Sequence, residues 1–165
     1  MPLLKDGREV DNVWAHAEDG HELSPGGCIT VSLGRFLSEH DVLLARNEAI
    51  GVRLAPSDDP GLLKEHLDRL HVIEVMFPKY TDGRGYSIAQ LLRRRLGYKG
   101  EMRAVGHVLR DQLGYMKRAG FDAMMFDSAN AEDIYAEATA ELSEVYQATA
   151  DGRETVFVKR HRGRA

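Results

Sequence analysis

Cysteine and long apolar runs are what this sequence most clearly lacks. Its one cysteine, Cys28, excludes an internal disulfide and an iron–sulfur cluster held by four thiolates. No stretch of 18 apolar residues offers a membrane span, and no apolar segment follows the first basic residue as a signal peptide requires. We therefore expect a cytoplasmic protein that is not associated with a membrane.

The chain also lacks a strong charge of one sign and the usual motifs for nucleotides and metals. Its formal net charge of -4 argues against a dedicated nucleic-acid binder, which needs a basic face. No Gly-Lys-Ser/Thr sequence is present, and Gly83-x-Gly85 is followed by Ile88 where a dinucleotide fingerprint needs a third small residue. The histidines show no spacing typical of zinc ligands. We predict neither a metal site nor a bound cofactor.

The remaining composition is that of one globular domain. A chain of 165 residues, 43% hydrophobic and 29% charged, suits a single domain with a sizeable core. We expect a short irregular N-terminal β region over residues 1–45, a regular core over residues 49–150 and a flexible basic tail over residues 159–165. The N-terminal region has strand-like segments and then a helix-like one, at Val13–Ala17, Cys28–Val31 and Leu33–Ala45.

Strand-like and helix-like segments alternate through the core. The predicted strands are at residues 50–54, 72–77, 101–105 and 123–126, and the helices that follow them begin at Pro60, Ser87, Leu109 and Ile134. Four consecutive βα units predict an α/β fold with a mainly parallel sheet. Because four units cannot close an eight-stranded barrel, the sheet should be open or half-barrel-like. After the core, Thr155–Val158 should form a short extended segment.

This architecture predicts where a ligand binds. Right-handed crossovers place the carboxyl ends of all parallel strands at one edge, and ligands of such folds bind beyond that edge. Polar residues follow the second and third predicted strands there. The predicted ligand-binding residues are Lys79, Asp82, Gly83, Arg84, Gly85, Tyr86, Ser87, Arg110 and Gln112.

The segment Thr81–Ser87 is open to two interpretations. Gly83 and Gly85 leave backbone amides uncovered, and a following helix N-terminus with the charge of Arg84 would favour an anion. In the alternative interpretation, Asp82 or Thr81 caps the helix and the glycines only shape the turn. Both remain open at this point.

His107 and Asp111 are the candidate catalytic residues. A histidine just past the third predicted strand could transfer a proton while Asp111 orients its ring. Equally, His107 could cap the next helix, and Asp111 could be a first-turn acid that suits the helix dipole. The run Arg93–Arg95 is expected on a solvated helix face.

Four segments carry a resemblance to known sequences, and these are Phe77–Ser87, Leu96–Glu101, Arg103–Gln112 and Gly120–Ala123. In their order and spacing they resemble a bacterial domain-of-unknown-function family (DUF934). The similarity is close from about residue 50 to residue 126 and weaker elsewhere. The family is labelled as an oxidoreductase involved in sulfite reduction. An acidic residue is common in it where this chain has His107, which weakens the case for that histidine as a family-wide catalyst.

The resemblance implies a role in assimilatory sulfate and sulfite reduction, because genes of this family typically neighbour that of sulfite reductase. It implies no established reaction. Sulfite reduction needs redox centres, and this chain lacks cluster ligands and a nucleotide-binding motif. The expected function is therefore that of an accessory protein, which works with sulfite reductase or its electron donor and binds a small oxyanion. The alternative is a small enzyme that acts on an anionic substrate such as a phosphate, sulfate or carboxylate. A homodimer is compatible with either.

Overall fold

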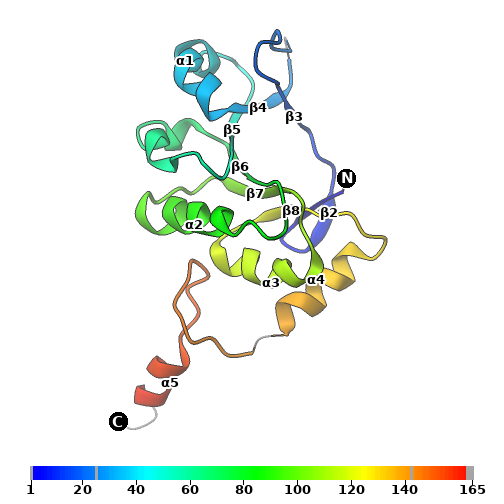
Figure 1. Ribbon diagram of the computed structural model, residues 1–165, viewed down its shortest axis with the longest axis vertical. Coiled ribbons are helices and arrows are strands. Elements are labelled where there is room, and N and C mark those ends of the chain that lie inside the picture. The colour runs from blue at the N-terminus through cyan, green and yellow to red at the C-terminus, as the bar shows by residue number, and fades with distance from the viewer. Residues whose placement is uncertain (1, 25, 142, 163–165) are drawn as a thin grey trace.

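The computed structural model describes residues 2–24, 26–141 and 143–162, which form one sheet with helices packed against it (Figure 1). The strands are β1 (Leu3–Lys5), β2 (Arg8–Val10), β3 (Trp14–His16), β4 (Cys28–Ser32), β5 (Ile50–Leu54), β6 (Val72–Phe77), β7 (Glu101–Gly106) and β8 (Ala123–Met125). The α-helices are α1 (Leu33–Leu44), α2 (Arg84–Gln90), α3 (Arg110–Ala119), α4 (Ala131–Ala140) and α5 (Val156–Arg162). Shorter helical segments are the 3₁₀ turns η1 (Pro60–Leu63) and η2 (Leu67–Arg69) and the π-helical η3 (Leu91–Arg95).

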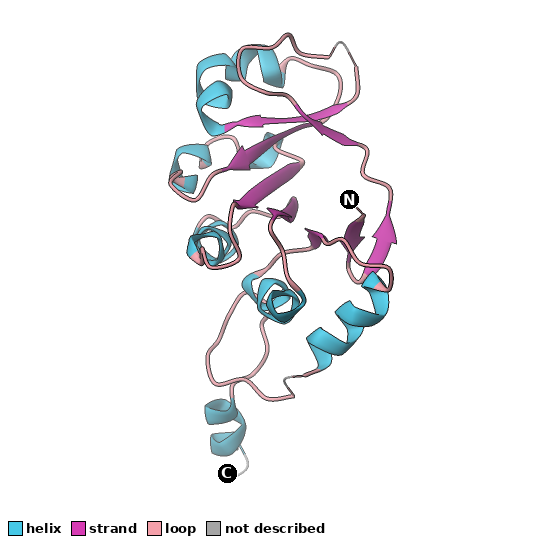
Figure 2. Ribbon diagram, turned by 45° about the vertical axis from the view of Figure 1, so that its right-hand side comes forward, coloured by secondary structure: helices cyan, strands magenta, loops and turns pink. Residues whose placement is uncertain are grey.

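The eight strands lie in the order β2-β1-β8-β7-β6-β5-β4-β3. From β3 to β8, each strand lies beside the next one along the chain and runs parallel to it. β1 pairs antiparallel with both β8 and β2, so the sheet is mixed. Figure 2 shows the strands fanning around as a curled half-barrel. The predicted α/β class and half-barrel-like sheet are confirmed at this level.

Helices α1, α2 and α3 cover one face of the sheet, as Figure 2 shows. Side chains of alternate strand positions on that face join helix residues in one buried cluster, which includes Val52, Ile73, Met102, Phe36, Leu92 and Leu113. Since successive residues of a strand point to opposite faces, the intervening positions face the other side. Those positions include Thr30, Arg53, Glu74 and Arg103. The second face of the half-barrel therefore carries polar and charged groups.

The four core strands begin at residues 50, 72, 101 and 123, where the sequence places them. The segment from Pro60 to Leu70 is two 3₁₀ turns where one helix was expected. Its hydrogen bonds join residues three apart, as from the Lys64 N–H to the Gly61 carbonyl. Leu63 is nevertheless buried, so the apolar pattern located the buried side correctly but not the helix type. The last predicted core helix, α4, ends earlier than expected.

The N-terminal region is more regular than the sequence indicated. Strands β3 and β4 and helix α1 lie where they were expected. The additional hairpin of β1 and β2 pairs Leu3 with Met125, and its Leu4 is fully buried. Asp6 and Gly7 form the turn with φ values of 50° and 83°, which suits the Asp-Gly turn of a two-residue hairpin. The Asp-Gly pair was the sequence signal for this hairpin.

The C-terminal end also differs from expectation. Residues Val156–Arg162 form α5, so the predicted extended segment at residues 155–158 is wrong. Side chains pair at helical spacing there, because the Phe157 and His161 ring centroids are 4.2 Å apart. Figure 1 shows α5 projecting from the rest of the molecule, and none of its side chains is buried. Lys159 to Arg162 of the predicted tail lie in this helix, whereas residues 163–165 lie outside the described residues.

Arg93 is not on a solvated face, which corrects part of the prediction for the arginine run. Its guanidinium donates hydrogen bonds to the carbonyls of Gly120, Tyr98 and Gly100 at 2.8–2.9 Å and forms an ion pair with Asp122. It thereby ties the end of η3 to the segments that enter β7 and β8. The neighbouring residues 94 and 95 are exposed, as expected.

Candidate functional site

The loops after β6 and β7 lie together at the carboxyl edge of the sheet. The His107 N–H donates to the Phe77 carbonyl at 2.7 Å, and the Gln112 side-chain amide donates to the Tyr80 carbonyl at 2.9 Å. The Tyr80 and His107 rings meet edge-on, with centroids 5.5 Å apart. Parallel pairing has therefore joined segments that are distant in the sequence, as the fold class requires.

The charged groups of the segment Thr81–Ser87 bind each other. Arg84 donates from Nε and Nη2 to the Asp82 carboxylate at 3.0 and 2.7 Å, and its backbone N–H donates to the same carboxylate. These hydrogen bonds hold the pKa of Asp82 below its ordinary value. Gly83 has an ordinary φ of -82°, and Gly85 lies inside α2, where a Cβ would come within 2.5 Å of the Phe77 ring. The geometry favours the capped-turn interpretation.

The proposed acid–base pair is not assembled in the structure. Asp111 has a side chain that is 90% exposed, and its one ion-pair partner within the described residues is Arg110, at 3.7 Å. Arg110 in turn pairs more closely with Glu141 of the segment after α4, at 2.7 Å. No hydrogen bond of the described chain joins His107 to Asp111. The side-chain oxygen of Gln112 accepts from the Leu109 N–H and so helps to begin α3.

Among the other predicted ligand residues, Lys79 and Ser87 are exposed. Neither takes part in an ion pair or side-chain hydrogen bond within residues 2–24, 26–141 and 143–162. Tyr86 is half-buried, and this burial raises the pKa of its phenol. Its ring meets that of Phe77 at 5.4 Å, so it contributes to packing at the edge of the core. These residues lie at the same edge of the sheet.

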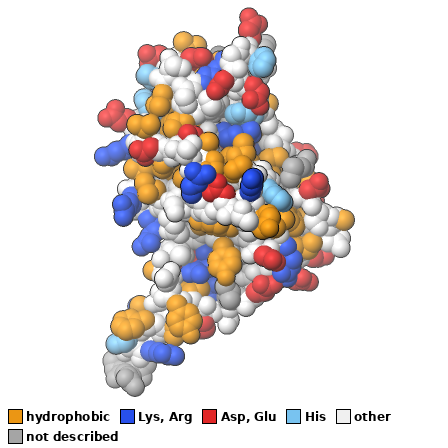
Figure 3. Space-filling model, in the orientation of Figure 1, with side chains coloured by type: hydrophobic (Ala, Val, Ile, Leu, Met, Phe, Trp, Pro, Cys, Tyr) orange, Lys and Arg blue, Asp and Glu red, His pale blue; other side chains and the backbone are white. Residues whose placement is uncertain are grey.

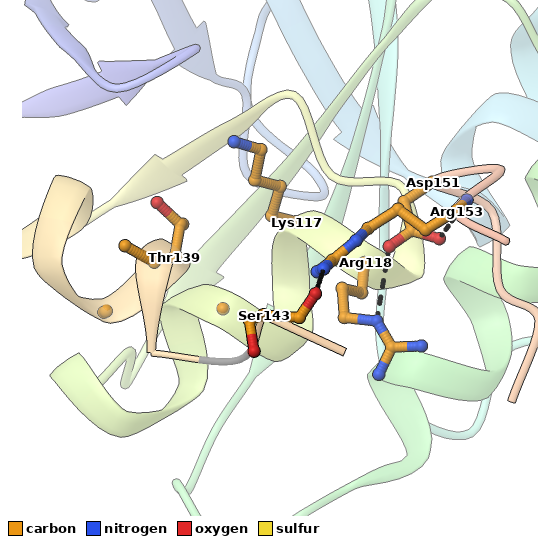
Figure 4. Close-up of a pocket in the computed structure, with 9 residues that line it drawn as sticks. Lys117, Arg118, Thr139, Ser143, Asp151 and Arg153 are labelled. Atoms are coloured by element: carbon orange, nitrogen blue, oxygen red, sulfur yellow. Dashed lines mark hydrogen bonds and ion pairs between the residues drawn. The ribbon is translucent and has the colours of Figure 1, made fainter. Parts of the chain in front are cut away.

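A cavity of about 470 Å³ lies between α3, α4 and the C-terminal segment (Figure 4). It is basic, with three cations and one carboxylate among its lining residues, which include Lys117, Arg118, Asp151 and Arg153. Arg118 pairs with Asp151 at 3.2 Å and also donates to the Gln147 carbonyl. Figure 4 shows Lys117 pointing away from that pair. The arginine therefore holds the C-terminal segment against α3, and the cavity is the seam between them.

The face of the sheet that α1, α2 and α3 do not cover carries a row of charged residues that lie opposite one another on neighbouring strands. Arg53 of β5 lies opposite Glu74 of β6, and Glu74 lies opposite Arg103 of β7. Glu74 is 3% exposed, and its Oε2 accepts from Arg53 Nε at 2.8 Å. A buried carboxylate needs such partners, because the loss of hydration is otherwise too costly. The pair of Arg53 and Glu74 is therefore a partly buried, hydrogen-bonded ion pair and not a solvated pair at the surface.

A hydrogen-bonded chain leads from this row to a histidine. The buried Thr30 hydroxyl donates to Glu74 Oε2 at 3.0 Å and lies 3.1 Å from His16 Nδ1. Burial lowers the pKa of His16, and the charge of Arg53 lowers it further, against the opposing effects of nearby carboxylates. His16 is therefore neutral at neutral pH. Thr30 reaches across β5 to Glu74, and the β5 residue opposite Thr30 is Gly51, which has no side chain.

The two arginines of the row differ in exposure and in how many partners their guanidinium groups have. Arg103 is 4% exposed, pairs with Glu101, donates to Asn12 Oδ1 at 2.8 Å and lies over the Trp14 ring. Arg53 has a side chain that is 22% exposed, and only its Nε has a hydrogen-bond partner within the described residues. We refer to Arg53, Glu74, Thr30 and His16 as the sheet-face cluster.

Sequence reasoning missed the sheet-face cluster because it searched only the loops. Strands that are covered on both faces read as nearly continuous hydrophobic runs. Here a charged residue interrupts three successive strands, at Arg53, Glu74 and Arg103. That repeated interruption was the available signal that helices cover only one face.

The described residues give no support for a metal site or for a membrane-spanning helix. Among the described residues, no three His, Cys, Asp or Glu side chains are grouped so that they could hold a metal ion. No helix in the same part of the chain is long and apolar enough to cross a bilayer.

A family model matches most of the chain. The model of a family described as "Bacterial protein of unknown function (DUF934)" matches residues 51–157, which is about two thirds of the chain. No curated protein matches the sequence. The matched range contains Arg53 and Glu74 of the sheet-face cluster, whereas His16 and Thr30 precede it.

Proposed function

The chain belongs to this bacterial family, and we propose that it is a cytoplasmic accessory protein of assimilatory sulfite reduction. In this proposed role it binds a small oxyanion and works with sulfite reductase or its electron donor. The sulfur assignment is supported by the sequence resemblance described above. The oxyanion is assigned to the carboxyl end of β5, where Arg53 is the penultimate residue.

The anion-binding part of the proposal rests on the hydrogen bonding of the Arg53 guanidinium group. The hydrogen bond from Nε to the buried Glu74 fixes the guanidinium plane, and the two terminal nitrogens have no partner within the described residues. A fixed guanidinium edge binds two oxygens of one oxyanion at once. At the loop edge, by contrast, Arg84 and Arg110 already bind carboxylates of the chain itself. Arg53 is therefore the better-prepared anion ligand.

Calorimetric titration of sulfite at pH 7 tests this assignment. We expect Arg53→Gln to weaken binding about 10-fold or more, because a charge-assisted bidentate contact contributes roughly 1.5–3 kcal/mol. Arg84→Gln is the matched control and should change the affinity less than about two-fold. If Arg84→Gln alone weakens binding, the ligand lies at the loop edge and the sheet-face assignment is wrong. If wild-type protein binds no sulfite, the oxyanion part of the proposal is wrong.

One observation favours the alternative that the chain is a small enzyme acting on an anionic substrate. A neutral histidine oriented by a hydroxyl and a buried carboxylate is an arrangement suited to general-base catalysis. This alternative requires turnover by the purified chain alone, whereas an accessory protein requires its partner. Assay of phosphate, sulfate and carboxylate esters with and without sulfite reductase separates the two.

A further inference from the structure

We propose that the sheet-face cluster selects oxyanions that carry a proton, with Arg53 binding the ionised oxygens and His16 Nε2 accepting a hydrogen bond from the O–H group. This inference rests on the proposed function and names the class of ligand that its site takes. The ligands that fit are monoanions of oxyacids, such as hydrogen sulfite and dihydrogen phosphate.

The first step of the argument is the tautomer of His16. A threonine hydroxyl has one proton to donate, and here that proton goes to the Glu74 carboxylate. The Thr30 oxygen can therefore only accept from His16, which requires the proton of the neutral imidazole to be on Nδ1. Nε2 is left with a lone pair. No hydrogen bond of the described chain uses Nε2, so a ligand there must bring its own donor.

The second step concerns the charge around the site. Glu74 offsets the charge of Arg53, with which it pairs at 2.8 Å. Further carboxylates lie close enough to raise the pKa of His16, at Glu18 and Asp19 in the loop after β3. Asp19 also accepts a hydrogen bond from Ser32 at 2.7 Å, at the end of β4 and opposite Arg53. This balance of one arginine against several carboxylates disfavours the binding of a dianion but allows the binding of a monoanion.

The groups that face His16 come from every neighbouring element, so its protonation reflects them all. They are Thr30 of β4, Arg53 of β5, Glu74 of β6, and Glu18 and Asp19 of the loop after β3. His21 and Glu22 line the adjoining cavity of about 280 Å³, together with His16. When His16 is protonated, both ring nitrogens donate, and an ionised oxygen then replaces the O–H group as the better partner.

Two anions of similar shape test the selectivity. Phosphate has a proton-bearing monoanion near pH 6.5, whereas sulfate does not, and a site built to bind an O–H group rejects the analogue that lacks it. We expect wild-type protein to bind phosphate about 10-fold more tightly than sulfate at pH 6.5. On lowering the pH below the depressed pKa of His16, sulfate affinity should rise. Sulfite titrated in parallel distinguishes hydrogen sulfite from phosphate as the preferred ligand.

Two variants separate the contribution of His16 from that of Arg53. Thr30→Val removes the hydroxyl with little change of shape, and His16→Phe removes the acceptor at a partly exposed position. Both should reduce the preference for phosphate over sulfate to less than about two-fold. Nitrogen NMR of the imidazole gives an independent readout, since wild-type His16 should be the Nδ1-protonated tautomer.

The outcomes distinguish this inference from the proposed function. Equal, Arg53-dependent binding of phosphate and sulfate, or an Nε2-protonated His16, overturns the selectivity and leaves the proposed function intact. If neither anion nor sulfite binds, both the selectivity and the oxyanion part of the proposed function are wrong.

Discussion

At the scale of single residues, the polar face of the sheet depends on a missing side chain. Gly51 lies between Thr30 and Val72 in the register of β4, β5 and β6. A Cβ at this position would come within 2.2 Å of Val72 Cγ1 and 2.6 Å of the Val72 carbonyl oxygen. The space that the glycine leaves is filled by its neighbours. The Thr30 methyl group and the Val72 side chain lie against it, and the Thr30 hydroxyl donates to Glu74 two strands away.

Gly51→Ala should therefore destabilise the protein. We expect a loss of roughly 1–3 kcal/mol in the free energy of unfolding, because the backbone of β6 cannot move away without distorting the ladder. Urea denaturation followed by circular dichroism measures it. Gly34→Ala in helix α1, where an added Cβ meets only Ser32 Oγ at 4.0 Å, is the matched control and should be neutral or stabilising. Equal stability of the two variants would contradict this account of β5.

At the scale of elements, periodicity located the strands well and the connections less well. A strand is identified by a short apolar run, which Val72–Phe77 shows plainly. The segment Pro60–Leu70 has helical apolar spacing but forms 3₁₀ turns, because hydrogen bonding at each turn is decided locally and not by the apolar pattern. The role of Arg93 could not be predicted either, since its carbonyl acceptors come from segments up to 27 residues away.

Arg93→Gln should loosen the connections into β7 and β8. We expect a loss of about 2–4 kcal/mol in the free energy of unfolding, because several carbonyls and the Asp122 carboxylate lose a charged donor. Arg94→Gln is the control, since within the described residues that exposed side chain makes a single long hydrogen bond, of 3.4 Å, to the Ala148 carbonyl. Thermal and urea denaturation of both variants measure and compare their losses in the free energy of unfolding. Similar losses in both would show that Arg93 acts only through its general charge.

At the scale of the whole molecule, the exposed C-terminal segment is the surface best suited to a protein partner. Tyr146 and Phe157 are 79% and 69% exposed, and hydrophobic and basic side chains gather on this projection in Figure 3. Exposed aromatic residues are enriched at the centres of protein interfaces. The partner in the proposed function, sulfite reductase or its electron donor, is therefore expected to contact this projection.

Replacing both aromatic residues, Tyr146→Ser with Phe157→Ser, should weaken co-purification of sulfite reductase about 10-fold or more at moderate salt. Val42→Ser, at a 66% exposed position on α1, is the control and should leave the complex intact. Retention of the reductase by the double variant would exclude this surface as its docking site. Light scattering tests the competing occupant, because a homodimer that the double variant dissociates would assign the surface to a second copy of the chain.

The sequence by itself determined the α/β class, the positions of the core strands and the family, because apolar runs and contiguous segments are local properties. It also placed the loops of one sheet edge together, since parallel strands share a direction. Only the tertiary structure decided that terminal nitrogens of Arg84 and Arg110 bind neighbouring carboxylates, whereas Arg53 binds Glu74 through Nε and has no further hydrogen-bond partner within the described residues. Which charge meets which partner depends on strand register and on which face the helices leave bare. Neither can be read from spacing along the chain.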